Sequence, residues 1–177
     1  YILILSGFRT GTNRLYPDIG QSVEHDGIPG VILGKSDGEA LVSTIKASPT
    51  PITATMTVLG DVVPDAQSAN IVGVVKGMTD DVIIVNTHHD AAFTGAVEDA
   101  SGISMVLALA KYWANFPYQF RIKTVYFVLE GNHWDWNYPS GSWHFINNSP
   151  DIMSRTCAVL GLEHIAQRVD VVDGHYV

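Results

Sequence analysis

Along the 177-residue chain, some apolar residues form short continuous runs, as in buried strands, and others recur every three to four positions, as in helices. Residues 82–85 (VIIV) form a β-branched run with the length and composition of a buried strand. In residues 101–113, apolar side chains recur at helical spacing: Ile103, Val106, Leu107 and Ala110. This pattern predicts a strand that leads through a short polar segment into an amphipathic helix, as in α/β folds.

The first 67 residues have a different character. Residues 28–47 predict a strand, a turn at 34–37 and a helix whose apolar stripe includes Leu41 and Ile45. Residues 52–60 then alternate with a period of two, as a half-buried strand would. We therefore expect two units, over residues 1–67 and 68–177. In the second, we expect the apolar segments 69–77 and 81–87 to pair as neighbouring strands across the turn at 77–80.

Polar side chains collect between the strand at 82–85 and the helix that follows. His88 and Asp90 come directly after the strand, and Asp99 stands just before the helix, where unpaired N–H groups favour a charged carboxylate. Ligands bind beyond the carboxyl ends of strands in open α/β sheets, and imidazole and carboxylate suit zinc. Asp90 could fix the tautomer of His88. The alternative is structural: Asp99 or Ser101 only caps the helix, and the histidines are ordinary loop residues.

The sequence from His88 to Gly102 resembles a family of metallopeptidases. A His-x-Asp at a strand end, a loop, an acidic-Asp-x-Ser-Gly box and an apolar helix are similar to the co-catalytic zinc aminopeptidases, peptidase family twenty-eight. The family includes bacterial leucyl aminopeptidases, glutamate carboxypeptidases and the non-catalytic transferrin receptor ectodomain. The resemblance implies a three-layer α/β fold, a mixed sheet flanked by helices. It also implies metal binding by His88 and Asp99, with Asp90 behind His88.

Two later segments extend the resemblance. Residues 121–130 match the next core strand, and Gly141 and Ser142 match the helix start that follows. Residues 157–166 match the strand that ends in an acidic ligand. Glu163 takes that position, where the family usually has Asp, and the carboxylate chemistry is retained. The first 67 residues resemble the tail of the protease-associated domain that is often inserted in these peptidases.

The main departure lies after residue 130. The family places a Glu-Glu pair there, one as general base and one as a metal ligand, whereas this chain reads EGNHWDWNYPSGS. Only Glu130 and His133 have suitable chemistry nearby. His133 is a candidate ligand or base, because an imidazole exchanges protons near neutral pH, and Glu130 is the alternative base. The chain resembles a divergent branch of the family, which has Gly-His in place of the Glu-Glu pair and a Glu-His-Ile box later in the sequence. His164 follows Glu163 in that box, but neighbours on a strand point to opposite faces.

The resemblance implies that one metal centre, formed by His88, Asp99 and Glu163, is retained, and that the ligands of the second centre are altered. This favours one zinc ion over two, since three protein ligands and a water make a catalytic zinc site. The chain opens on an apolar strand without an initiator methionine, so we interpret it as an internal piece of a longer protein. The family's last ligand, a downstream histidine, would then lie beyond Val177.

Function follows from the resemblance in two versions. In the first, the protein is a metal-dependent hydrolase of aminopeptidase or carboxypeptidase type, which acts on peptide or aminoacyl substrates. In the second, it is a catalytically inactive binding or scaffold module with the peptidase fold. The resemblance alone favours an extracytoplasmic or secreted protein, and the sequence leaves the oligomeric state open.

Composition and motif spacing argue against several other classes of protein. The formal charge is −8 and the ten Lys and Arg residues do not cluster, which disfavours nucleic acid. No apolar run approaches the roughly 18 residues of a membrane span. Residues 95–102 lack phosphate-loop spacing, and residues 139–143 lack the elbow of a serine hydrolase. Four aromatic residues surround the altered segment and favour packing over a pocket wall: Trp134, Trp136, Tyr138 and Trp143.

Overall fold

The computed structural model describes residues 2–5, 31–55, 57, 65–91, 95–133, 140–166, 171–172 and 175–176. The chain divides into two compact units. One is Ala66–Val169, and the other combines Tyr1–Asp65 with Asp170–Val177. In the described part of the chain, no helix has the length and apolar character that a bilayer crossing requires.

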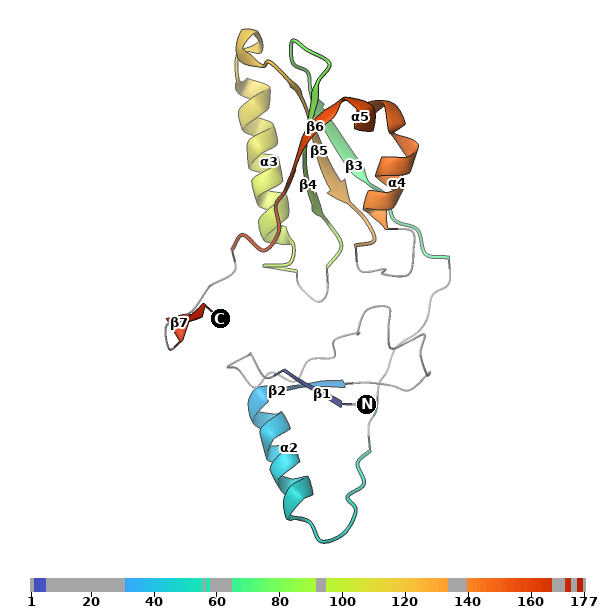
Figure 1. Ribbon diagram of the computed structural model, residues 1–177, viewed down its shortest axis with the longest axis vertical. Helices are drawn as coiled ribbons and strands as arrows, with labels where there is room; N and C mark the ends of the chain where they lie inside the picture. Colours follow the sequence, from blue (N-terminus) through green and yellow to red (C-terminus); the bar gives the residue numbers. More distant parts are fainter. Residues whose placement is uncertain are drawn as a thin grey trace. The chain divides into compact units, whose positions relative to one another are not determined.

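A mixed four-stranded sheet forms the centre of the Ala66–Val169 unit (Figure 1). Its strands are β3 (Ile71–Val75), β4 (Val82–His88), β5 (Thr124–Glu130) and β6 (Thr156–Gly161), in the order β3-β5-β4-β6. Strands β5, β4 and β6 run parallel, and β3 pairs with β5 in the antiparallel direction. The parallel strands therefore end at the same edge of the sheet.

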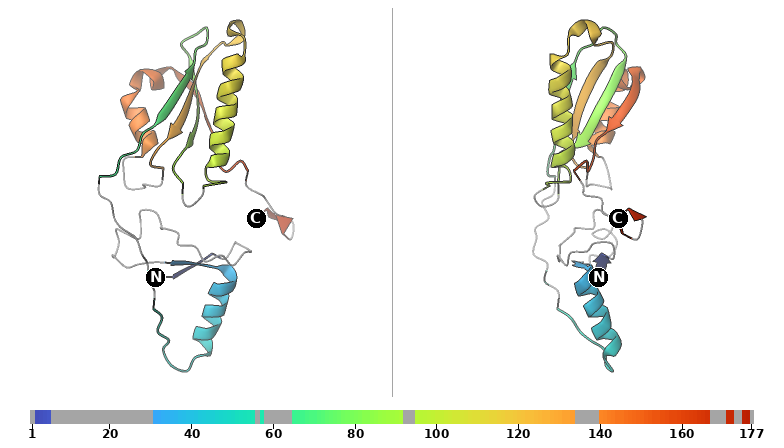
Figure 2. Two further views of the ribbon diagram at one scale, coloured as in Figure 1. Left: turned by 180° about the vertical axis from the view of Figure 1, so that it is seen from behind. Right: turned by 90° about the vertical axis from the view of Figure 1, so that its left-hand side faces the viewer.

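Helices cover both faces of this sheet (Figure 2). Helix α3 (Ala100–Asn115) lies on one face, and α4 (Gly141–Asn148) with α5 (Pro150–Arg155) lies on the other. A 3-10 turn, η1 (Tyr118–Phe120), connects α3 to β5. Alternate residues of β4 enter the two cores: Val85 packs in the cluster of Val106 on α3, and Ile84 in the cluster of Phe145 on α4. Both faces of β4 are covered, which agrees with the unbroken apolar run at residues 82–85 in its first half. The predicted three-layer α/β architecture is confirmed.

Two local predictions in this unit are wrong. Strands β3 and β4 are not neighbours, because β5 lies between them. The turn after β3 is bonded instead to the segment before β5, through Met78 N to Arg121 O (2.7 Å) and Thr79 N to Ile122 O (2.9 Å). In α3, Leu107 is 55% exposed, although its spacing placed it on the core face. The other residues of the predicted stripe do face the core: Val106 is 1% exposed, and Ile103 and Ala110 pack in its cluster.

The other unit contains a parallel pair of strands, β1 (Ile2–Leu5) and β2 (Val31–Gly34), and helix α2 (Lys35–Ala47). The predicted strand and helix are present, but α2 begins directly after β2, without the expected turn. Residues 52–55 and 57 are exposed and have no regular structure, so the strand predicted at 52–60 is wrong there. An alternating sequence gives a segment one apolar and one polar face, but a β-strand also needs a neighbouring strand to which its backbone can hydrogen-bond.

Two short strands, β7 (Val171–Val172) and β8 (His175–Tyr176), pair antiparallel. The protease-associated identity of residues 1–67 stays a prediction.

Candidate metal centre

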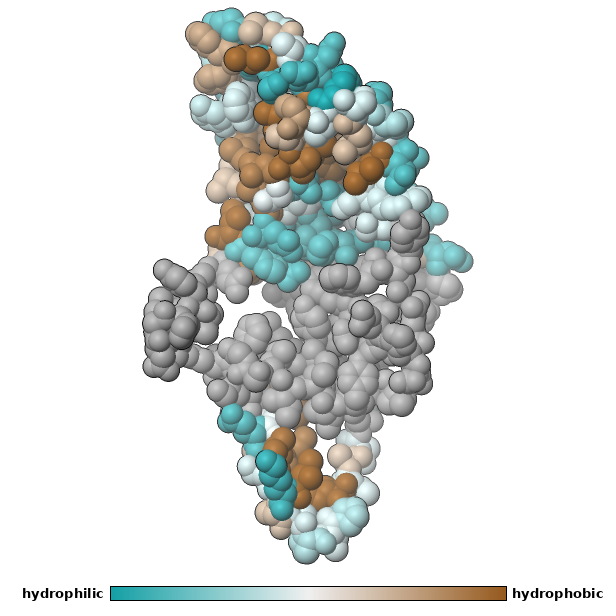
Figure 3. All heavy atoms as spheres, viewed as in Figure 1, coloured by the Kyte–Doolittle hydropathy of each residue, from teal (hydrophilic) through white to brown (hydrophobic). Residues whose placement is uncertain are grey.

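Functional side chains converge where the parallel strands end. His88 is the last residue of β4, Glu130 is the last residue of β5 and pairs with it in register, and Glu163 follows β6 by two residues. Figure 3 shows hydrophilic side chains gathered at this end of the unit, beyond a band of apolar ones. The carboxyl edge of such a sheet is where ligands bind, so the topology explains why residues distant in sequence meet here.

His88 is held in one tautomer. Its ring is buried, with a side chain 3% exposed, and its Nδ1 lies 2.8 Å from the backbone oxygen of Asp90. A carbonyl oxygen only accepts, so in the neutral ring Nδ1 carries the proton and Nε2 carries the lone pair. The Asp90 carboxylate adds a contact of 3.4 Å to the same Nδ1. Both the backbone and the side chain of Asp90 contact Nδ1, which supports the orienting role that stays predicted for this residue.

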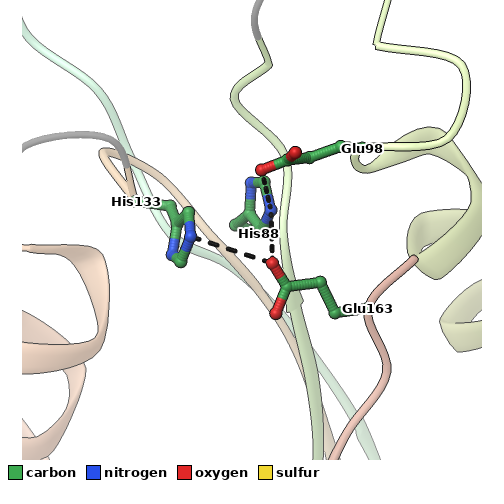
Figure 4. Close-up of side chains that lie close together, drawn as sticks. All are labelled: His88, Glu98, His133 and Glu163. Atoms are coloured by element: carbon green, nitrogen blue, oxygen red, sulfur yellow. Dashed lines mark ion pairs between the residues drawn. The ribbon is translucent and has the colours of Figure 1, made fainter. Parts of the chain in front are cut away.

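The lone pair of His88 faces two carboxylates (Figure 4). His88 Nε2 lies 3.9 Å from Glu98 Oε1 and 3.7 Å from Glu163 Oε1. His133 completes the group from the other side: its Nε2 lies 3.9 Å from Glu163 Oε1, and its ring stacks on that of His88 with centroids 4.0 Å apart. The four ligand atoms all lie within 4.8 Å of one another.

This donor set fits a divalent cation. Atoms that bind one zinc ion at about 2.0–2.2 Å lie up to about 4 Å from each other, close to the separations seen here. His88 Nε2 is buried and has no hydrogen-bond partner, which is costly unless something binds it. Two imidazoles and two carboxylates are ligands that zinc accepts. The group therefore fits one such ion with small adjustments of its side chains.

Asp99, predicted as a ligand, does not belong to this group of four. It is the N-cap of α3: its Oδ1 accepts from Gly102 N at 3.2 Å and from His164 N at 3.3 Å. Its residue is only 1% exposed. Burial raises the pKa of Asp99, and the hydrogen bond from His164 N is the largest effect that opposes the rise. Its Oδ2 is buried without a hydrogen-bond partner, so a role for Asp99 toward a cation stays a prediction.

Glu98 is the residue that sequence reasoning missed. The signal was present, because the chain has two acids in succession before the helix, but residue type does not say which one turns toward His88. His164 was also underestimated. Strand β6 ends at Gly161, and His164 has a φ of 51°, so Glu163 and His164 need not alternate as on a strand. His164 Nε2 lies 3.0 Å from Glu98 Oε2 and 3.7 Å from Glu163 Oε1.

Glu130, the alternative base, has both carboxylate oxygens engaged. Oε1 accepts from Asn86 Nδ2 at 2.9 Å, and Oε2 accepts from the hydroxyl of Ser142. A cavity of about 280 Å³ opens beside the group, lined by the ends of β4, β5 and β6 and by His133 and Ser142.

The aromatic residues predicted to pack near this segment are mostly untested. Trp134, Trp136 and Tyr138 lie outside the described residues. Trp143, in the first turn of α4, is 37% exposed.

Comparison with known proteins identifies a family. The family model described as Peptidase family M28 matches residues 70–174, which include the whole four-stranded sheet and the four residues of the group. No curated protein matches the chain, and no solved structure does either.

Proposed function

The chain belongs to peptidase family M28, a family of metal-dependent peptidases, and on that premise we propose that it hydrolyses peptide bonds with one bound zinc ion. The proposed ligands are His88, Glu98 and Glu163, and the proposed proton acceptor is His133. One observation carries the proposal: the buried Nε2 of His88 has no hydrogen-bond partner and faces two carboxylates. Glu98 takes the ligand position that the sequence had suggested for Asp99.

The ligand assignment rests on charge and access. Three protein ligands leave a position open, as catalytic zinc sites require. When bound, the cation would polarise a peptide carbonyl and lower the pKa of a water molecule toward 7. Asp90 keeps the His88 lone pair directed at the site through Nδ1. The carboxylates of Glu98 and Glu163 balance the two positive charges.

His133 is better placed than Glu130 to accept the proton of the attacking water. A general base needs a lone pair within reach of the substrate. Both carboxylate oxygens of Glu130 already accept hydrogen bonds within the protein. Both residues line the cavity, but Glu130 is only 9% exposed, whereas the side chain of His133 is 37% exposed and its Nε2 faces Glu163. We therefore assign Glu130 to holding the fold around the cavity and His133 to proton transfer.

Hydrolysis assays on the full chain test this function. Aminoacyl reporters with a free amino end and peptide reporters with a free carboxyl end separate the aminopeptidase from the carboxypeptidase type. We expect zinc-dependent turnover of one class, abolished by a chelator. His88→Ala should lose both zinc and turnover, whereas His133→Ala should keep zinc and lose turnover by about 100-fold or more.

His144→Ala is the matched control, because it removes an exposed imidazole of α4 outside the group. Turnover that persists unchanged in His88→Ala would refute the site. Stoichiometric zinc binding without hydrolysis of either reporter class would favour the inactive scaffold instead.

A further inference from the structure

Asn70 connects the residue that follows β5 with the first residue of α4. Gly131 comes directly after Glu130, where β5 ends, and Gly141 begins α4. Asn70, directly before β3, bonds to both glycines. Gly131 N donates to Asn70 Oδ1 at 3.0 Å, and Asn70 Nδ2 donates to Gly141 O at 2.7 Å. The side-chain amide of Asn70 therefore bonds to two residues that lie 61 and 71 positions later in the chain.

The two glycines are in direct backbone contact. A Cβ atom at Gly141 would lie 2.1 Å from Gly131 O and 2.6 Å from Asn70 Oδ1. A Cβ atom at Gly131 would lie 2.3 Å from Ser68 Oγ. Only glycines allow this approach. The contact leaves one backbone donor and one backbone acceptor for Asn70, and a primary amide is the uncharged side chain that satisfies both.

A second pair of bonds holds the adjoining residues independently. The Glu130 carboxylate accepts from Asn86 Nδ2 and from the hydroxyl of Ser142. These bonds join β4, β5 and α4 without Asn70, so α4 stays attached to the sheet if Asn70 is replaced. The local effect of Asn70 falls on Gly131, two residues before His133.

We propose that Asn70 is a positioning residue for His133, an inference that rests on the proton-transfer role proposed above. By fixing Gly131 against Gly141, it sets the origin of the turn in which Asn132 has a φ of 61°. That turn delivers the His133 ring to its stack on His88, with Nε2 3.9 Å from Glu163 Oε1. Without the amide, the ring spends less time within reach of the attacking water.

Asn70→Asp and Asn70→Ala in the full chain test the proposal. The aspartate keeps an acceptor for Gly131 N but places an oxygen against Gly141 O, and the alanine loses both bonds. Outer-shell partners that orient metal ligands typically contribute 10- to 100-fold, and we expect an effect of similar size for a group that orients His133. We expect kcat to fall by about 10-fold or more in both variants, while KM and zinc affinity change by less than about twofold.

A double-mutant cycle separates positioning from general damage to the fold. In a His133→Ala background, Asn70→Ala should lower residual turnover no further, because the side chain that it positions is absent. Asn115→Ala is the control, since Asn115 also bonds a backbone oxygen, that of Lys111, at the far end of α3. An equal fall in both backgrounds would overturn the proposal.

Proton NMR of the histidine rings in the zinc-free protein makes the test independent of turnover. The stack on His88 shifts the ring signals of His133, and Asn70→Ala should move them while those of His144 stay in place. Unmoved His133 signals would overturn the positioning role, whatever the activity. Signals that move in a protein without hydrolytic activity would support positioning and contradict the proposed function.

Discussion

Glu98 and Asp99, the two acids before α3, have different surroundings, so we expect their alanine variants to have opposite effects on stability with and without zinc. Glu98 Oε1 faces His88 Nε2 at 3.9 Å, whereas Asp99 Oδ1 is bonded to the backbone of Gly102 and His164. We expect Glu98→Ala to remove most zinc-dependent stabilisation and to cost the zinc-free protein at most about 1 kcal/mol, for the lost contact with His164 Nε2 at 3.0 Å. Asp99→Ala should destabilise the zinc-free protein and keep most of the stabilisation by zinc.

The magnitudes follow from these contacts. Loss of the N-cap bond of Asp99 costs about 1 kcal/mol, and loss of its second backbone bond costs about as much, so the free energy of unfolding should fall by about 2 kcal/mol. Zinc at 100 times its Kd stabilises a protein by about 2.7 kcal/mol. If Glu98→Ala weakens zinc binding by about 100-fold, the same zinc concentration stabilises the variant by only about 0.4 kcal/mol.

Urea denaturation followed by tryptophan fluorescence measures both quantities, with zinc and with a chelator. All four tryptophans (113, 134, 136 and 143) belong to the Ala66–Val169 unit, so the signal reports the unit that holds the site. Asp151→Ala is the control: it removes an exposed acid of α5 whose ion pair with Arg155 is worth at most about 0.5 kcal/mol. The reasoning is refuted if Asp99→Ala abolishes the effect of zinc while Glu98→Ala preserves it.

Two further predictions concern the fold around the site. Gly141→Ala should destabilise the unit by about 1–3 kcal/mol, because its Cβ would lie 2.1 Å from Gly131 O, whereas Gly73→Ala should cost less than about 0.5 kcal/mol, because its Cβ has only Phe127 Cβ at 4.0 Å. Equal losses in urea denaturation would contradict this difference. Val106→Ala, at a position 1% exposed, should cost about 2 kcal/mol in the same assay, and a loss below about 0.5 kcal/mol would show that α3 packs differently.

The sequence predicted elements well where burial is local and strong. The apolar run of β4 and the helical spacing of α3 were legible because each packs its own residues into a core. The pairing of β3 with β5 was not, because it joins Ile71 to Leu129 across many intervening residues, and the alternation within β3 suits either partner. For the same reason, residues 52–55 alternate without forming a strand.

In the candidate site too, features set by local sequence were predictable, and features set by the path of the backbone were not. His88 could be located from sequence, because a strand end fixes both its place and its direction. The choice between Glu98 and Asp99 depends on how the backbone enters α3, which residue type does not determine. His164 was assessed by strand geometry, but β6 ends earlier, and its positive φ turns the chain.

Charge decides the number of metal ions that we expect. The proposed ligand set holds two carboxylates, Glu98 and Glu163, and the imidazole of His88, which binds a cation in the neutral form. Its formal charge of about −2 balances one divalent ion, and a second ion nearby would leave positive charge uncompensated. Glu130 also carries a formal negative charge, but Asn86 Nδ2 and the Ser142 hydroxyl hold its two oxygens in hydrogen bonds, so we do not count it among the ligands.

Asp99, next to Glu98 in the chain, is a further carboxylate, but burial raises its pKa and its Oδ1 caps α3. Titration of the zinc-free chain should therefore saturate at one tightly bound zinc per chain, as measured by calorimetry and by metal analysis after dialysis. Asp99→Asn should keep that stoichiometry, because the amide oxygen can still cap the helix. Two tight sites in the wild-type chain, reduced to one by Asp99→Asn, would show that Asp99 binds a second ion and that the charge argument fails.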